Sequence, residues 1–98
     1  MNEYEKELMK APSLVREWCV VCGRPATNLH HVVYRSHGGK DSPLVSLCGF
    51  GNASGCHGLV HHNRIHFRYT GRWEYLITDE PVKVDVAYES GGWLPCST

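Results

Sequence analysis

Cysteine and histidine residues that could bind a metal ion are concentrated in residues 19–62. This stretch holds four of the five cysteines and six of the seven histidines of the 98-residue chain. The cysteines are Cys19, Cys22, Cys48 and Cys56, and the histidines include the neighbours His30 and His31 and the pair His57 and His61. Thiolates and imidazoles are ligands that suit zinc and related transition metals. The sequence therefore predicts a module organised around metal.

The spacing of the four cysteines favours one shared zinc ion. Cys19 and Cys22 form a C-x-x-C knuckle, which alone fits a redox pair or two buried thiols as well as zinc. Cys48 and Cys56 form a second pair, separated by a seven-residue spacer that contains three glycines. Such a spacer can loop out and return both sulfurs to one centre. Because two cysteine pairs occur in one short chain, zinc binding is favoured over a redox pair or two buried thiols.

The histidine spacing suggests a second site. His57 and His61 are four residues apart, so on a helix both imidazoles lie on one face, about one turn apart. An exposed pair without a metal is the ordinary alternative for such spacing. His30 and His31 are expected on a strand, where neighbouring side chains point to opposite sides. Imidazole can act as a general base near neutral pH, and a divalent cation stabilises the charge that develops in phosphodiester hydrolysis.

Short helices and strands must position these side chains. The pattern predicts a helix over residues 3–10, a short turn over 13–18, strands over 29–34, 44–47, 66–69, 73–77 and 82–88, and a second helix from residue 56. The strand over 82–88 rests on the alternation of Val82, Val84 and Val86 with other residues. Trp18 is expected to anchor the core. Cys96 has no partner by spacing and is expected to be a free thiol.

Length and charge limit the class of protein. The chain is expected to form one small domain, with a helical segment over residues 1–17, a core over about 18–63 and a β-rich extension over 64–98. A net charge of zero argues against a strongly basic nucleic-acid binder, but residues 16–72 carry +5 and residues 79–98 carry −3. The basic middle is predicted to face phosphates, with solvated surface charge as the alternative. The candidate contacts are Arg35, Lys40, Arg64 and Arg68.

The N-terminal residues are charged and include no apolar run. No signal peptide is visible, and no window approaches the length of a transmembrane helix. An odd number of cysteines without a secretory signal favours metal-bound thiolates over disulfides. The expected location is the cytoplasm, with no membrane contact.

The combined motifs resemble a known nuclease family. In order, they are C-x-x-C, H-H followed by apolar residues, G-G, L-V-x-L-C and C-H-x-x-x-H, over about residues 18–63. This order is similar to the HNH endonucleases, the ββα-metal or His-Me finger nucleases, in their small, cysteine-rich, phage-associated form. The resemblance implies an α+β fold in which two strands and a helix surround one catalytic divalent ion, Mg²⁺, Mn²⁺, Ni²⁺ or Zn²⁺. The resemblance also implies a separate structural zinc bound by four cysteines. The C-terminal β-hairpin and strand expected in this chain would extend that fold.

The resemblance also implies roles for individual residues. His31 corresponds to the general base, and His30, His57 and His61 correspond to the ligands of the catalytic ion. The ligands of the structural zinc correspond to Cys19, Cys22, Cys48 and Cys56. DNA is the implied substrate of a monomer or weak dimer, and a phage-packaging or other host protein is a further implied partner.

One position departs from the family pattern. Pro43 stands where the family carries its asparagine, and proline has no side-chain amide to orient the base. Ser42, Asn52 or a backbone carbonyl are the candidates to replace it. The departure leaves two alternatives open. One is a zinc-stabilised nucleic-acid-binding module with weak or no catalysis, and the other is a chain in which both ligand sets hold structural zinc.

Overall fold

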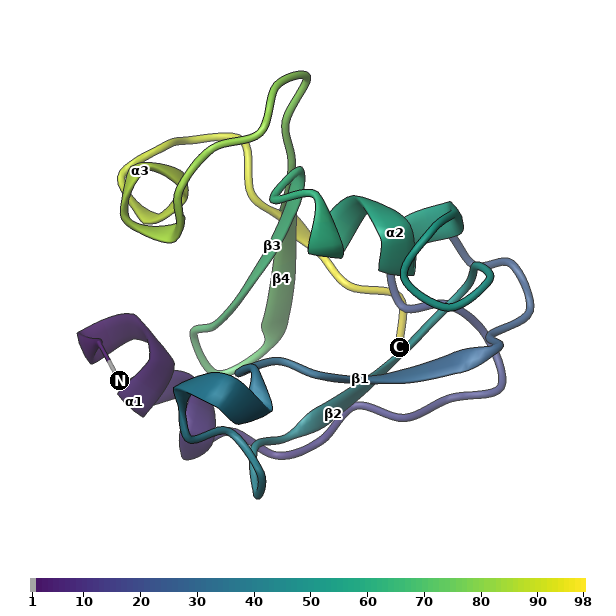
Figure 1. The fold of residues 1–98 in the computed structure, drawn as a ribbon, viewed down its shortest axis with the longest axis horizontal. Helices are drawn as coiled ribbons and strands as arrows, with labels where there is room; N and C mark the ends of the chain where they lie inside the picture. The colour runs from purple at the N-terminus through teal and green to yellow at the C-terminus, as the bar shows by residue number, and fades with distance from the viewer. Residues whose placement is uncertain (1) are drawn as a thin grey trace.

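Two antiparallel β-sheets and three α-helices make up the part of the chain that the computed structural model describes, residues 2–98 (Figure 1). The elements are α1 (Glu3–Met9), β1 (Asn28–His31), the 3₁₀ helix η1 (Arg35–His37), β2 (Leu44–Leu47), α2 (Gly55–His61), β3 (Ile65–Tyr69), β4 (Trp73–Ile77), α3 (Val84–Tyr88) and β5 (Leu94–Pro95). This arrangement confirms the predicted mixed α+β class. None of the helices within residues 2–98 has the length and apolar character needed to cross a bilayer.

The first sheet is a two-stranded ribbon of β1 and β2, which lie in the segments predicted as strands over residues 29–34 and 44–47. It is antiparallel, with His30 opposite Val45 and His31 opposite Leu44. The predicted strand over residues 29–34 is too long, because β1 ends at His31 and η1 begins four residues later. Val45 also forms a parallel bridge with Leu14. The predicted turn over residues 13–18 is therefore wrong, since this segment extends along β2.

The second sheet has the order β3-β4-β5. β3 and β4 form the predicted hairpin, with Ile65 opposite Ile77 and Tyr69 opposite Trp73. β5 pairs with the outer edge of β4 and was not predicted. α2 packs against both β2 and β3, so it joins the ribbon to the second sheet (Figure 1).

The predicted strand over residues 82–88 is wrong, because the chain forms α3 there. Ala87 is fully buried and Val84 and Tyr88 are half-buried, whereas Val86 is 49% exposed. Residues 84, 87 and 88 are three and four positions apart, so they lie on one face of a helix. Burial of this face favours a helix over the strand that the alternating valines predicted. The Tyr88 hydroxyl donates a hydrogen bond to the Phe67 carbonyl (2.6 Å), which attaches α3 to β3.

The predicted N-terminal helix is confirmed as α1, and it begins with a capping box. The Asn2 side chain accepts a hydrogen bond from the Glu5 amide (2.8 Å), and the Glu5 carboxylate accepts one from the Asn2 amide (3.2 Å). Glu5 also pairs with His37 of η1, with 3.1 Å between the carboxylate oxygen and Nδ1. These bonds hold α1 against the loop that follows β1.

One hydrophobic core connects α1, the ribbon, α2 and the second sheet. Its most buried side chains include Val20, Val45, Leu47 and Ile65. The predicted role of Trp18 as a core anchor is wrong, because its side chain is only half-buried. Its backbone forms an isolated antiparallel bridge with Pro25 at the edge of the knuckle.

Candidate functional site

The four cysteines that were predicted to share a zinc ion meet at one point. Their sulfur atoms all lie within 4.8 Å of one another. Cys19 and Cys22 come from the loop before β1, Cys48 follows β2, and Cys56 lies in the first turn of α2. All five cysteines are free thiols, including the buried Cys96. The four clustered sulfurs could hold one metal ion, as four thiolates do in structural zinc sites.

Crowding within this cluster shifts the acidity of the thiols in opposite directions. A hydrogen bond with Cys56 lowers the pKa of Cys19, and the same contact raises the pKa of Cys56. The Cys22 and Cys48 sulfurs are 3.5 Å apart, and the backbone amide of Cys56 lies 3.4 Å from the Cys48 sulfur. Protons shared between crowded sulfurs are easily displaced by a cation, so this donor set fits a metal ion.

Two glycines close the neck of the spacer between Cys48 and Cys56. Gly49 has a φ of 122° and Gly55 a φ of 65°. A Cβ atom on Gly49 would overlap the Ser54 carbonyl, and one on Gly55 would overlap the backbone of Gly49. Only glycine allows the two ends of the spacer to approach this closely, and the approach brings both sulfurs to one centre.

A second group consists of His30, His57 and His61. Each offers one ring nitrogen, and the three nitrogens all lie within 4.8 Å of one another. The Nε2 atoms of His57 and His61 are 3.2 Å apart, and the ring centroids of His30 and His57 are 5.1 Å apart. We call these three residues the histidine triad. No fourth Cys, His, Asp or Glu side chain within residues 2–98 joins the triad, so an ion bound there would keep coordination positions open.

The spacer loop orients one member of the triad. Nδ1 of His57 lies 2.6 Å from the carbonyl oxygen of Gly51. Because a carbonyl can only accept, Nδ1 carries the proton, and the Nε2 lone pair faces the triad. Cys56 and His57 are adjacent in α2 and belong to different clusters, so the same turn of helix joins the two clusters.

Burial keeps two members of the triad, His30 and His61, in the form that binds metal. Desolvation, with smaller contributions from the neighbouring histidines, lowers the pKa of His30 to about 3. Desolvation also lowers the pKa of His61. A neutral imidazole has a free lone pair, so both rings are ready to act as ligands at neutral pH.

His31, the predicted general base, follows the triad residue His30 on β1 and is half-buried. Its Nδ1 lies 3.4 Å from the Ser42 hydroxyl oxygen. Of the candidates to replace the family asparagine, Ser42 is the one that the structure places beside His31. The Pro43 carbonyl instead accepts from the Val32 amide (3.1 Å), and Asn52 is exposed on the spacer loop.

The four basic residues predicted to contact DNA are not equivalent. Arg35 and Lys40 are exposed and have no ion pair within residues 2–98. Arg64 donates to the Thr78 carbonyl (3.0 Å). Arg68 donates to the Glu74 carboxylate (2.7 Å) and lies 4.5 Å from the centre of a Trp93 ring.

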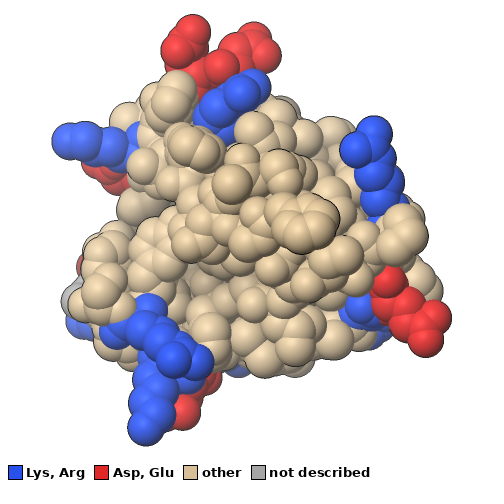
Figure 2. Space-filling model, turned by 45° about the vertical axis from the view of Figure 1, so that its right-hand side comes forward, with Lys and Arg blue, Asp and Glu red and all other residues tan. Residues whose placement is uncertain are grey.

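Figure 2 shows Lys and Arg side chains set apart around the edge of one face, with an uncharged centre. This face therefore presents no continuous basic surface. Of the four predicted contacts, Arg35 and Lys40 are the two that have neither an ion pair nor a side-chain hydrogen bond within the described residues.

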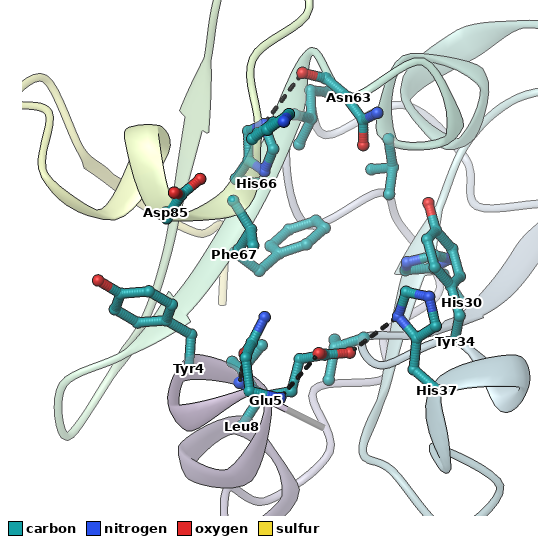
Figure 3. Close-up of a pocket in the computed structure, with 16 residues that line it drawn as sticks. Tyr4, Glu5, Leu8, His30, Tyr34, His37, Asn63, His66, Phe67 and Asp85 are labelled. Carbon is teal, nitrogen blue, oxygen red and sulfur yellow. Dashed lines mark hydrogen bonds and ion pairs between the residues drawn. The ribbon is translucent and has the colours of Figure 1, made fainter.

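A cavity beside the triad was not predicted from the sequence. Its walls come from α1, β3 and the start of α3 as well as from His30 (Figure 3). Elements so far apart in the chain meet only in the folded molecule, so no local motif could indicate the cavity.

Comparisons with protein-family models, with curated proteins and with solved structures find no match to this chain. The likeness to HNH endonucleases therefore rests on the motifs of residues 18–63. The grouping of the cysteine and histidine ligand atoms in the structure does not depend on any relative. A functional proposal for this chain therefore starts from these two clusters.

Proposed function

We propose that the chain is a metal-dependent endonuclease of the HNH type that hydrolyses phosphodiester bonds in DNA. One observation carries the proposal: three imidazole nitrogens from β1 and α2 converge within 4.8 Å, and no Cys, His, Asp or Glu of residues 2–98 joins them as a fourth ligand. A structural zinc site is closed by four protein ligands, whereas a catalytic site keeps a position for water or substrate. The ribbon and the helix that supply these ligands also occur in the order ββα.

The proposed mechanism gives His31 the role of general base. Donation of the Nδ1 proton to the Ser42 oxygen, 3.4 Å away, leaves Nε2 free to take a proton from the attacking water. A divalent ion held by His30, His57 and His61 would stabilise negative charge on the phosphate and on the leaving oxygen. Arg35 and Lys40, both exposed, would contact flanking phosphates.

The cysteine cluster has a structural role in this proposal. A zinc ion on the four thiolates would fix the first turn of α2 and the spacer loop. The spacer loop holds His57 through the Gly51 carbonyl, 2.6 Å from Nδ1. The structural zinc would therefore act on catalysis by positioning a ligand of the other ion.

The main competing function is a zinc-stabilised nucleic-acid-binding module without cleavage. Pro43 in place of the family asparagine favours it, since Ser42 is a shorter partner for the base. Incubation of supercoiled plasmid with the purified protein and Mg²⁺, Mn²⁺ or Ni²⁺, or with EDTA, separates the two. The nuclease gives nicked or linear plasmid with at least one cation and none with EDTA. Retarded but uncut plasmid under every condition supports the binding module.

A further inference from the structure

A cavity of about 530 Å³ lies directly beside the histidine triad. Its wall includes His30 together with aromatic and aliphatic side chains such as Tyr4, Phe67 and Val84 (Figure 3). The volume lies within the range of sites that bind small organic molecules. Because His30 belongs to both the wall and the triad, a group in the cavity would lie next to an ion on the triad.

The walls of the cavity are held in place by specific contacts. The rings of Tyr4 and Tyr88 stack at 4.3 Å with an angle of 20° between their planes. The Tyr88 hydroxyl is bonded to the Phe67 carbonyl at 2.6 Å, and the hydrogen bond between Glu5 and His37 closes the side near η1. The cavity is therefore preformed, although α1 and α3 are short.

Polar groups at the cavity can both donate and accept hydrogen bonds. Asn63, which follows α2 and has a φ of 59°, accepts at its backbone carbonyl from His66 Nε2 and from the Val82 amide, both at 3.0 Å. The Asn63 side-chain amide has no hydrogen-bond partner within residues 2–98. The charged groups of the lining are Lys83, Asp85 and Glu5, the last of which also bonds to His37. With two carboxylates against one lysine, this lining suits a neutral planar ring better than a phosphate.

We propose that this cavity binds one unpaired nucleobase of the substrate, next to the scissile phosphate. The inference rests on the proposed function, because that function brings nucleic acid to His30. Aromatic walls can stack on any base, and an amide can bond the polar edge of a base that is not paired. A paired base is not available to a cavity of this kind. Single-stranded or locally unpaired DNA is therefore the preferred substrate class, ahead of continuous duplex.

Nucleoside binding tests the cavity without requiring cleavage. We expect deoxyadenosine and thymidine to shift the backbone NMR signals of Asn63, Phe67 and Val84, while deoxyribose alone does not. Val84→Trp, which fills the cavity, should weaken nucleoside binding by at least about tenfold. Val86→Trp on the exposed side of the same helix is the matched control and should bind as the wild type does.

A second variant covers the case in which Val84→Trp fails to fold. Asn63→Gly suits the positive φ of 59° and removes the side-chain amide together with its Cβ, so it should fold and bind the nucleosides more weakly. Nucleoside shifts that are absent in the wild type, or equal in wild type and Val84→Trp, would overturn the inference.

Cleavage of oligonucleotides separates this inference from the proposed function. The expected result is faster cleavage of a single strand than of its duplex, with a loss when one base beside the cut is replaced by an abasic unit. Equal cleavage of all these substrates would refute the base site and retain the nuclease. Nucleoside binding without cleavage by any cation would refute the nuclease and retain the cavity as a base-binding site.

Discussion

At the level of single residues, neighbouring side chains belong to two separate clusters of ligand atoms. The adjacent residues Cys56 and His57 belong to different clusters, and the Gly51 carbonyl fixes the His57 tautomer from the spacer loop. His31 has the Ser42 hydroxyl as its partner at 3.4 Å. Each of these contacts has a separate measurable consequence.

His57→Ala should weaken binding of a divalent ion to the triad by about 10-fold or more, because one of three ligands is lost. Calorimetric titration of the zinc-containing protein measures the affinity. His62→Ala is the matched control, since His62 directly follows α2 as its C-cap, is exposed and is not a member of the triad. Equal affinities of the two variants would remove His57 from the site.

The buried neutral form of His30 should make stability depend on pH. Its pKa in the folded chain is about 3, against 6.5 for an unperturbed histidine, so protons bind preferentially to the unfolded chain in this window. The contribution to stability is fully present above about pH 6.5, declines as pH falls and is lost near about pH 3. Between about pH 6.5 and pH 5.5 the free energy of unfolding should fall by up to about 1.4 kcal/mol through this group.

Denaturant unfolding of wild type and His30→Asn, without added cation, measures this contribution. The variant should show a smaller loss of unfolding free energy across the same pH interval, because asparagine does not titrate. The cysteines contribute equally to both proteins, so their effect cancels in the comparison. Identical pH dependence would mean that His30 is not buried as a neutral ring.

Only the family resemblance implied that His30 would join His57 and His61. The spacing of residues predicted the group of four cysteines and the pair His57 and His61, which the structure brings together, because a C-x-x-C knuckle and an i,i+4 pair are short-range geometry. It could not choose Ser42 over Asn52 as the partner of His31, because that depends on the path of the loop between β1 and β2. It also gave no reason to expect the intramolecular contacts of Arg64 and Arg68, whose partners Thr78 and Glu74 lie on or beside β4.

At the level of elements, the spacer loop and α2 determine whether the clusters form. The valine alternation over residues 82–88 fitted a strand, but β4 already has β3 and β5 on its two edges, and residues 84, 87 and 88 bury one helical face instead. Short elements of this kind are decided by tertiary packing, which the local sequence does not contain.

Gly49→Ala should destabilise the protein and weaken zinc binding, because its Cβ would overlap the Ser54 carbonyl. Backbone strain of this type costs about 1–3 kcal/mol. Thermal unfolding and zinc retention in a chelator measure the two effects. Gly91→Ala is the control, since a Cβ on Gly91 meets no atom within 4 Å and should leave both quantities unchanged.

At the level of the whole molecule, metal should contribute much of the free energy of folding. The chain has 98 residues, and its core includes three of the clustered cysteines, Cys19, Cys48 and Cys56. Small domains with so little buried surface commonly depend on such a metal. The core over residues 18–63 is also continuous with α1 and the second sheet, so loss of the metal should affect the entire fold.

Cys22→Ser should therefore give a poorly folded protein with less than one zinc ion per chain, because structural zinc contributes folding free energy directly. Cys96→Ala is the control: burial raises the pKa of Cys96 to about 12, and it is outside the cluster. Circular dichroism and zinc analysis of both variants make the comparison. A cooperative melt of Cys22→Ser at the wild-type temperature would show that the fold does not need the metal.

The central claim is that His31 acts as the base of a metal-dependent nuclease. Its most direct test is the rate of plasmid nicking by wild type and His31→Ala, with Mn²⁺ in excess and with calorimetric confirmation that both bind the ion. A positioned general base contributes about 10²–10⁴-fold, so the variant should lose at least about 100-fold in rate while metal affinity is unchanged. Full nicking activity in metal-loaded His31→Ala would contradict the account.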